Sequence, residues 1–327
     1  MNKPDTQIIA EIANVHGGDV EIAQECVDQV KDHCDAVKFQ IFSADELVDV
    51  DHPDRQMIES LEFSNREWDG IMSRTTRSNV DVIVDVFGTR GLRFAQKYDA
   101  DGVMIHSSDM SNLPLIREVG AYDGQVILGV GGVTRSEVDT ALQLVSPDEI
   151  LLMYGVQSYP TALEHTFIGR VPTLASLYGH PVGFASHADA TSSMAIDIPA
   201  YAVTAGAAAV EVHVTTDRVG AEYDYYSALE PDEFALMASR VRHAEILLQT
   251  ADGEMAPHEQ EYRALHRKWP TSAHMINQGE KIRPDDVVYK RAPSPDDLPD
   301  GRIGAVIGRT TSEELPGGAI ITEEMLR

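Results

Sequence analysis

The chain has 327 residues and a formal net charge of −27, so it is long enough for one large domain and a small one. The acidity argues against nucleic acid and anionic membranes as partners, because phosphate binding needs clustered lysine and arginine. With two cysteines, Cys26 and Cys34, a disulfide framework is not expected, and a reducing, cytoplasmic compartment is favoured.

The acidic residues are spread along the chain, and only seven residues are lysine. Strong acidity with little lysine suits a salt-rich cytosol, in which counterions screen the self-repulsion. A halophilic protein is therefore expected over an ordinary acidic one. No apolar, positively charged signal segment opens the chain, and charged residues and a proline interrupt its most apolar stretch, residues 194–214. That stretch predicts a buried helix and strand, and no membrane span.

Eight short segments rich in β-branched residues recur along the chain and predict strands. Segments with helical spacing lie between them, such as VEIAQECVDQVKDH and RSEVDTALQLV. The alternation predicts a (β/α)8 TIM barrel over residues 1–250. A doubly wound open sheet is the alternative, and no GxGxxG fingerprint supports it. The predicted strands are IIAEIAN (8–14), DAVKFQIF (35–42), DVIVDVF (81–87), GVMIHS (102–107), QVILGVG (125–131), EILLMYG (149–155), PVGFASH (181–187) and AAVEVHVT (208–215).

After the predicted barrel the sequence becomes polar and then rich in glycine and proline. Residues 251–263, which include most of TADGEMAPHEQE, predict a linker. Residues 264–327 hold only short apolar runs and predict a compact β-rich module. Such a small core is marginal alone, so we expect the module to rest on the barrel or on a second subunit.

The last predicted strand, AAVEVHVT, contains Glu211 and His213, which face the same side of a strand. A neutral polar group buried without a partner costs roughly 2–7 kcal/mol, so partners are expected on that side. Barrel enzymes place their chemistry at the carboxyl ends of the strands. A lone histidine there is usually structural, but many polar residues gather at this rim. They are Glu11, Asn14, Lys38, Gln40, Asp85, Ser107, Asp109, Gln157, Tyr159, His187, Glu211 and His213.

Motifs along almost the whole chain resemble the sialic acid synthase family, which condenses phosphoenolpyruvate with an amino-sugar aldehyde. They begin with AEIANVHGGDVEIAQECVDQVKDHCDAVKFQIF and continue with IHSSDMSNLPLI, SYPTALEH, GFASHADAT, VEVHVT and SALEPDEF. GEKI, YKRAP and IGR near the end are similar to the family's antifreeze-like SAF domain. The resemblance implies a TIM barrel followed by a small β-rich SAF domain.

The resemblance also implies roles for matching residues. His187 and His213 match the two histidines that hold a divalent metal, for which Mn²⁺ is expected and Mg²⁺ or Co²⁺ are alternatives. Catalytic roles are expected for Glu11, Lys38 and Glu211, with Glu211 contacting the sugar. Arg291 matches a SAF-domain arginine that reaches the neighbouring subunit's site, which implies a domain-swapped homodimer. The expected substrate-binding residues are Gln40, Ser107, Asp109, Gln157, Tyr159, Asp224 and Arg291.

Several positions depart from the family pattern for binding phosphoenolpyruvate. Met104, Asp85, Gln157 and Ala185 stand where the family has lysine, threonine, asparagine and serine. An ionised carboxylate at Asp85 would repel a phosphate group.

Two further positions are open. Arg90 and Arg93 follow the third predicted strand and are candidates to restore the lost positive charge, with ordinary helix-surface arginines as the equal alternative. The family's sugar-binding aspartate after the last barrel strand corresponds to Glu222, Tyr223 or Asp224.

Together these features predict a phosphoenolpyruvate-dependent transferase of the sialic acid synthase type. It would condense phosphoenolpyruvate with an N-acylated amino-sugar aldehyde, such as N-acetylmannosamine, to a nonulosonic acid with release of phosphate. One alternative is a metal-dependent, aldolase-like enzyme that uses another 2-oxo acid. A non-catalytic sugar-binding relative is the other.

Overall fold

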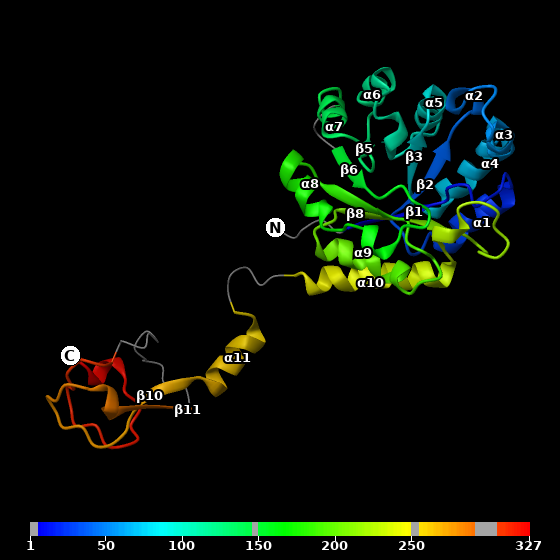
Figure 1. Cartoon of the computed structure of the whole chain (residues 1–327). Helices are drawn as coiled ribbons and strands as arrows, with labels where there is room; N and C mark the ends of the chain where they lie inside the picture. Colours follow the sequence, from blue (N-terminus) through cyan, green and yellow to red (C-terminus); the bar gives the residue numbers. More distant parts are fainter. Residues whose placement is uncertain (1–5, 146–149, 250–254, 292–305) are drawn as a thin grey trace. The chain divides into compact units, whose positions relative to one another are not determined.

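The structure is a computed structural model that describes residues 6–145, 150–249, 255–291 and 306–327 (Figure 1). The chain divides into two compact units, Met1–Gln249 and Thr250–Arg327. Each is described by itself below.

The first unit is a closed barrel of parallel strands, as predicted. Each strand pairs with the next, and β1 also pairs with β8, which closes the ring (Figure 1). A short strand, β9 (Ala228–Leu229), extends β8 in parallel. The eight barrel strands are β1 (Gln7–Glu11), β2 (Ala36–Ile41), β3 (Asp81–Val86), β4 (Gly102–Ile105), β5 (Gln125–Gly129), β6 (Ile150–Tyr154), β7 (Val182–Ser186) and β8 (Ala209–Val214).

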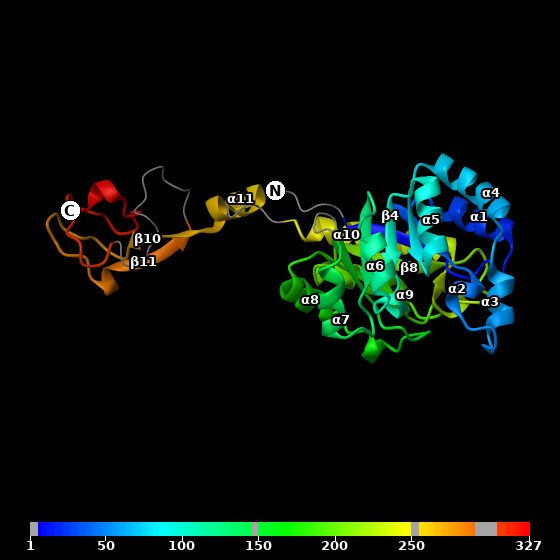
Figure 2. The ribbon, with the colours of Figure 1, turned by 90° about the horizontal axis from the view of Figure 1, so that it is seen from above.

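The helices lie on the outside of the strands (Figure 2). Residues 194–214 form a buried helix and then a strand, as predicted, and α10 packs along α9. In the described ranges, no helix is long and apolar enough to cross a membrane. The helices of this unit are α1 (Val20–Val30), α2 (Ala44–Leu47), α3 (Arg55–Leu61), α4 (Asn65–Thr75), α5 (Thr89–Tyr98), α6 (Leu113–Val119), α7 (Arg135–Leu142), α8 (Arg170–Tyr178), α9 (Met194–Thr204) and α10 (Pro231–Leu247).

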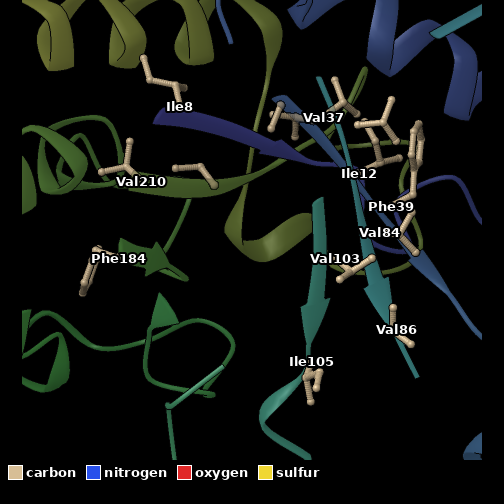
Figure 3. Packing of buried hydrophobic residues seen from close by; sticks show 14 of the residues in the cluster. Ile8, Ile12, Val37, Phe39, Val84, Val86, Val103, Ile105, Phe184 and Val210 are labelled. Atoms are coloured by element: carbon tan, nitrogen blue, oxygen red, sulfur yellow. The ribbon is translucent and has the colours of Figure 1, made fainter. Parts of the chain in front are cut away.

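Alternating strand residues form two separate cores. One set of side chains, including Ile8, Val37, Phe184 and Val210, belongs to the large apolar layer around the strands (Figure 3). The residues of opposite parity point into the barrel. Their lower layer is apolar and consists of Ile9, Ala36, Ile83, Met104, Ile127, Leu151, Met153, Ala185 and Ala209.

The polar side chains of the barrel mouth continue these inward-facing rows. Glu11 follows Ile9 by two residues, and in the same way Lys38 follows Ala36 and Asp85 follows Ile83. On β8, Glu211 and His213 follow Ala209 with the same parity. These candidate side chains therefore lie next to a layer of buried apolar residues inside the barrel.

The second unit contains helix α11 (Pro257–His266) and an antiparallel pair, β10 (Lys268–Ser272) and β11 (Val287–Arg291). This agrees with the predicted β-rich module. Its small core consists of Ile276, Ile282, Val306, Leu315, Ile321 and Leu326.

Residues 251–254 of the predicted linker (251–263) lie outside the described residues, and helix α11 occupies its second half. Pro257 stands in the first turn, where its missing N–H costs nothing. The Glu259 carboxylate accepts a hydrogen bond of 2.7 Å from the Ala256 backbone N–H, which satisfies one of the unpaired donors at the helix start. The polar composition of the segment suggested a loop, although Pro257 and Glu259 are typical residues at the start of a helix.

Candidate active site

Lys38 lies at the centre of the barrel mouth and is fully buried. Its Nζ lies 2.8 Å from Glu11 Oε2 and 2.8 Å from Glu211 Oε2. Asp85 Oδ2 is farther away, at 3.7 Å, and Met104 Sδ lies at 3.2 Å. Glu211, whose burial predicts a partner, thus finds one in Lys38. The barrel closure brings them together, because β1 pairs with both β2 and β8.

Burial and charge act against each other in this cluster. Burial disfavours the charged forms of Lys38 and Glu11, but the neighbouring charges outweigh it. They raise the pKa of Lys38 and lower that of Glu11. Burial raises the pKa of Glu211 well above its usual range, and Glu11 adds to the effect. The pKa of Asp85 is also raised, chiefly by burial. Lys38 and Glu11 thus form the charged pair, whereas burial shifts Glu211 and Asp85 towards their neutral forms.

A chain of hydrogen bonds runs from Glu11 to the rim. Gln40 Nε2 donates to Glu11 Oε1 at 2.8 Å, and Asn14 Nδ2 donates to Gln40 Oε1 at 3.2 Å. The backbone N–H of Asn14 donates to Asp224 Oδ2 at 3.0 Å. Of the three candidates for the sugar-binding aspartate, Asp224 joins this chain. Glu222 is exposed, and Tyr223 packs against the apolar cluster of Phe42, Ala44, Ile58 and Leu61.

His187 and His213 lie side by side at the mouth, with ring centroids 5.2 Å apart. His187 Nδ1 lies 2.9 Å from the Val156 carbonyl oxygen, which can only accept, so Nδ1 carries the proton and Nε2 keeps a free lone pair. Burial lowers the pKa of His187 to about 3, so this ring is neutral at physiological pH. His213 Nε2 lies 4.0 Å from Glu11 Oε2. The Tyr159 ring lies 4.6 Å from His187 and 6.0 Å from His213.

Two neighbouring imidazoles fit a divalent transition metal, and the buried His213 Nδ1 has no hydrogen-bond partner in the described part of the chain. The described residues hold no group of three or more His, Cys, Asp or Glu side chains arranged to bind a metal. An ion here would therefore take its other ligands from water and substrate.

The cavity that these side chains line opens to solvent and has an empty volume of about 320 Å³, with the solvent space at its mouth included. Gln157 and Tyr159 lie at its exposed edge, and the Tyr159 hydroxyl donates to Gln157 Oε1. The lining residues are Glu11, Lys38, Gln40, Asp85, Met104, His106, Met153, Gly155, Gln157, Tyr159, Ala185, His187, Glu211 and His213.

The loop after β4 carries two of the predicted substrate-binding residues, Ser107 and Asp109. His106 lines the cavity, whereas Ser107 and Asp109, expected to bind substrate, do not and instead form a short 3₁₀ turn. Asp109 Oδ1 accepts from Asn112 Nδ2 at 3.0 Å, just before α6. The sequence could have predicted that His106 faces the cavity, because His106 follows the inward-facing Met104 by two residues.

Two arginines considered as sources of positive charge lie elsewhere. Arg90 donates to the Phe42 and Phe63 carbonyl oxygens and forms an ion pair of 2.8 Å with Glu62. Arg93 is exposed and donates to Thr89 Oγ1 at 3.0 Å. Neither lines the cavity. The described contacts favour the alternative in which neither arginine supplies charge to the cavity, because Arg90 ties loops to α5 and Arg93 is exposed. In the second unit, Arg291 ends β11 and is exposed.

Comparisons with known proteins agree with this geometry. The NeuB family model matches residues 26–253, and the SAF domain model matches residues 271–327. The N,N'-diacetyllegionaminic acid synthase of Legionella pneumophila is 26% identical over 97% of this chain and 93% of its own.

Solved structures show the same folds. An N-acetylneuraminic acid (sialic acid) synthetase from Leptospira borgpetersenii superposes with a TM-score of 0.73 and 28% identity, over 79% of this chain and 91% of its own. A putative spore coat polysaccharide biosynthesis protein E from Chromobacterium violaceum has a TM-score of 0.84 over 99% of this chain and 100% of its own, at 19% identity, which speaks for the fold alone. The chain therefore belongs to the NeuB family and carries a SAF domain after its barrel.

Proposed function

We propose that this protein is a nonulosonic acid synthase that condenses phosphoenolpyruvate with an N-acylated amino-sugar aldehyde of the N-acetylmannosamine type. The observation that carries the proposal is the Lys38–Glu11–Glu211 cluster next to the His187–His213 pair in a NeuB-family barrel. Relatives named as synthases of legionaminic and sialic acids support the product class.

In the proposed reaction, the methylene carbon of phosphoenolpyruvate attacks the sugar aldehyde and a carbon–carbon bond forms. The aldehyde oxygen takes up a proton. Water adds to the resulting oxocarbenium carbon and loses a proton, and the carbon–oxygen bond to phosphate then breaks. Glu11 is suited to stabilise the positive charge, because Lys38 keeps its buried carboxylate ionised. Glu211, which favours its neutral form, is suited to donate a hydrogen bond to a sugar hydroxyl.

We propose that His187 and His213 hold a divalent ion, Mn²⁺ by preference, with Mg²⁺ or Co²⁺ as alternatives. Such an ion would act as a Lewis acid on the sugar aldehyde and would hold it in place. Gln40, Gln157, Tyr159 and Asp224 lie around this position and are proposed to bind the sugar.

The charge of the cavity favours a second candidate, an aldolase-like reaction with a free 2-oxo acid. Lys38 is the one lysine or arginine among the described lining residues, and two carboxylates already hold it. A monoanion such as pyruvate is easier to place there than a trianion. A Schiff-base mechanism through Lys38 is disfavoured, because its raised pKa keeps the amine protonated.

The test is incubation with phosphoenolpyruvate and a panel of N-acylated amino sugars, with phosphate release as the readout. Pyruvate with the same sugars is the parallel arm. Sugar-dependent phosphate release supports the synthase. Consumption of pyruvate without it supports the aldolase-like candidate. Sugar binding without either reaction supports a non-catalytic relative.

We also propose a domain-swapped homodimer in which Arg291 of one chain binds the sugar held by the other, because Arg291 ends β11 in the second unit and its side chain is exposed there. A salt-adapted, cytoplasmic protein is proposed from the net charge of −27 and the scarcity of lysine. A maximum of thermal stability in dilute buffer would contradict the salt adaptation.

A further inference from the structure

The acidic groups of the barrel cavity outnumber its cations. Glu11, Asp85 and Glu211 contribute three carboxyl groups, and Lys38 is the one lysine or arginine that the structure describes along the lining. Lys38 Nζ lies 2.8 Å from both Glu11 and Glu211. Even with a divalent ion at the histidine pair, three ionised carboxylates and an anionic substrate would exceed the positive charge of the cavity, which favours a proton on at least one carboxyl group.

Asp85 is the carboxyl group of this cavity that receives no hydrogen bond from Lys38. Its side chain is fully buried, and Lys38 Nζ lies 3.7 Å away, beyond hydrogen-bond distance. Neither Oδ1 nor Oδ2 has a hydrogen-bond partner in the described part of the chain. Its neighbours in register across β2 and β4 are Gln40, which donates to Glu11, and Met104, a thioether. A bare carboxylate in this position would be very costly.

We infer that Asp85 is a neutral carboxylic acid whose O–H donates a hydrogen bond to an anionic oxygen of the substrate bound in the barrel cavity. Its side chain lines the cavity and has no competing acceptor or donor engaged, so both oxygens are available to a ligand. A buried neutral acid without an internal hydrogen-bond partner is a strong donor to an anion. The repulsion expected from the sequence applies only to the ionised form.

The charges that face Asp85 agree with a neutral group. Burial raises its pKa most. Lys38 on β2 and His106 after β4 lower the pKa, whereas Glu11 on β1 and Asp109 beyond β4 raise it. As the pH rises through the pKa of Asp85, the acid becomes a carboxylate, the donor is lost, and anion binding weakens.

The first experiment measures protonation without any ligand. Infrared difference spectra between wild type and Asp85→Asn at pH 7 should contain the C=O stretching band of a buried carboxylic acid. A carboxylate band alone would overturn the inference. The difference between wild type and Asp81→Asn is the matched control, since Asp81 stands at the exposed start of the same strand and should give a carboxylate band.

The second experiment measures calorimetric binding of phosphoenolpyruvate, pyruvate and inorganic phosphate. Asp85→Asn keeps an N–H donor and should bind within a few-fold of wild type, whereas Asp85→Ala should bind about ten- to a hundredfold more weakly. Asp81→Asn should match wild type. Thermal melting verifies that each variant is folded. Three outcomes would overturn the inference. They are equal losses of affinity in Asp85→Asn and Asp85→Ala, a large gain of affinity in Asp85→Asn, and no binding of any of the three probes to wild type.

This inference rests on the proposed use of the cavity for an anionic substrate, but the two fail separately. The synthase proposal alone fails if no sugar promotes phosphate release. The role of Asp85 still stands in that case, provided that Asp85 shows the acid band and that Asp85→Ala loses pyruvate or phosphate binding. If phosphate is released but Asp85 is ionised at pH 7, only the role of Asp85 fails.

Discussion

Lys38 Nζ lies 2.8 Å from Glu11 Oε2, and both side chains are buried in the mouth of the barrel. Burial alone would neutralise Glu11, yet its pKa is lowered, chiefly because the Lys38 ammonium lies beside it. The pair therefore keeps an ionised carboxylate where little water reaches it. In the proposed reaction this carboxylate faces the developing positive charge.

Removing the cation of this pair should damage both stability and activity. Lys38→Met leaves buried carboxyl groups without their partner, and we expect the free energy of unfolding to fall by about 3–5 kcal/mol. Urea unfolding measures this loss. Lys31→Met is the control, because Lys31 is a partly exposed residue beside Asp28 and should cost no more than about 1 kcal/mol. Equal stabilities of the two variants would contradict the central role of Lys38.

A buried histidine away from the active-site pair should make stability depend on pH. Burial lowers the pKa of His16 to about 4, and its Nδ1 accepts from the Gly18 N–H at 2.9 Å. In the unfolded chain its pKa is about 6.5. His16 therefore favours the folded state above pH 6.5, and this contribution is lost as the pH falls towards 4.

Between pH 7 and pH 5, wild type should lose about 2 kcal/mol more unfolding free energy than His16→Gln. Urea titrations at the two pH values measure the difference. His33→Gln, a substitution of an exposed histidine, should behave as wild type. Parallel losses in wild type and His16→Gln would refute the assignment.

The two histidines of the mouth should bind a metal together. His213→Ala should lose Mn²⁺ binding measured by equilibrium dialysis, and chelator should abolish activity until Mn²⁺ is added back. His33→Ala is the matched surface control. Full metal occupancy in a variant lacking both His187 and His213 would rule out the proposed metal site.

The proposed dimer predicts complementation between two inactive chains. After mixing Arg291→Ala with His213→Ala, random pairing puts half of the chains in hybrids with one complete site of two, so about a quarter of the activity should return. Lys290→Ala, next to Arg291 on β11, should retain activity by itself. A fully active monomer on size exclusion would disprove the exchange.

Much of the fold was predictable, because the eight apolar segments and their inward and outward parity are local features. The common facing of Glu211 and His213 follows from that parity, and both line the cavity. The partner of Glu211 was not predictable, because the contact with Lys38 depends on how the barrel closes between β8 and β1. The contacts of Arg90 were not predictable either, because the carbonyl groups of Phe42 and Phe63 that accept its hydrogen bonds come from loops distant in the sequence.

The most direct test of the account is phosphate release by wild-type protein supplied with phosphoenolpyruvate, Mn²⁺ and N-acylated amino sugars, with pyruvate consumption followed in parallel. The account predicts release that requires both a sugar and phosphoenolpyruvate, and that His213→Ala abolishes. Consumption of pyruvate, with no phosphate release from any amino sugar at millimolar phosphoenolpyruvate, would contradict it.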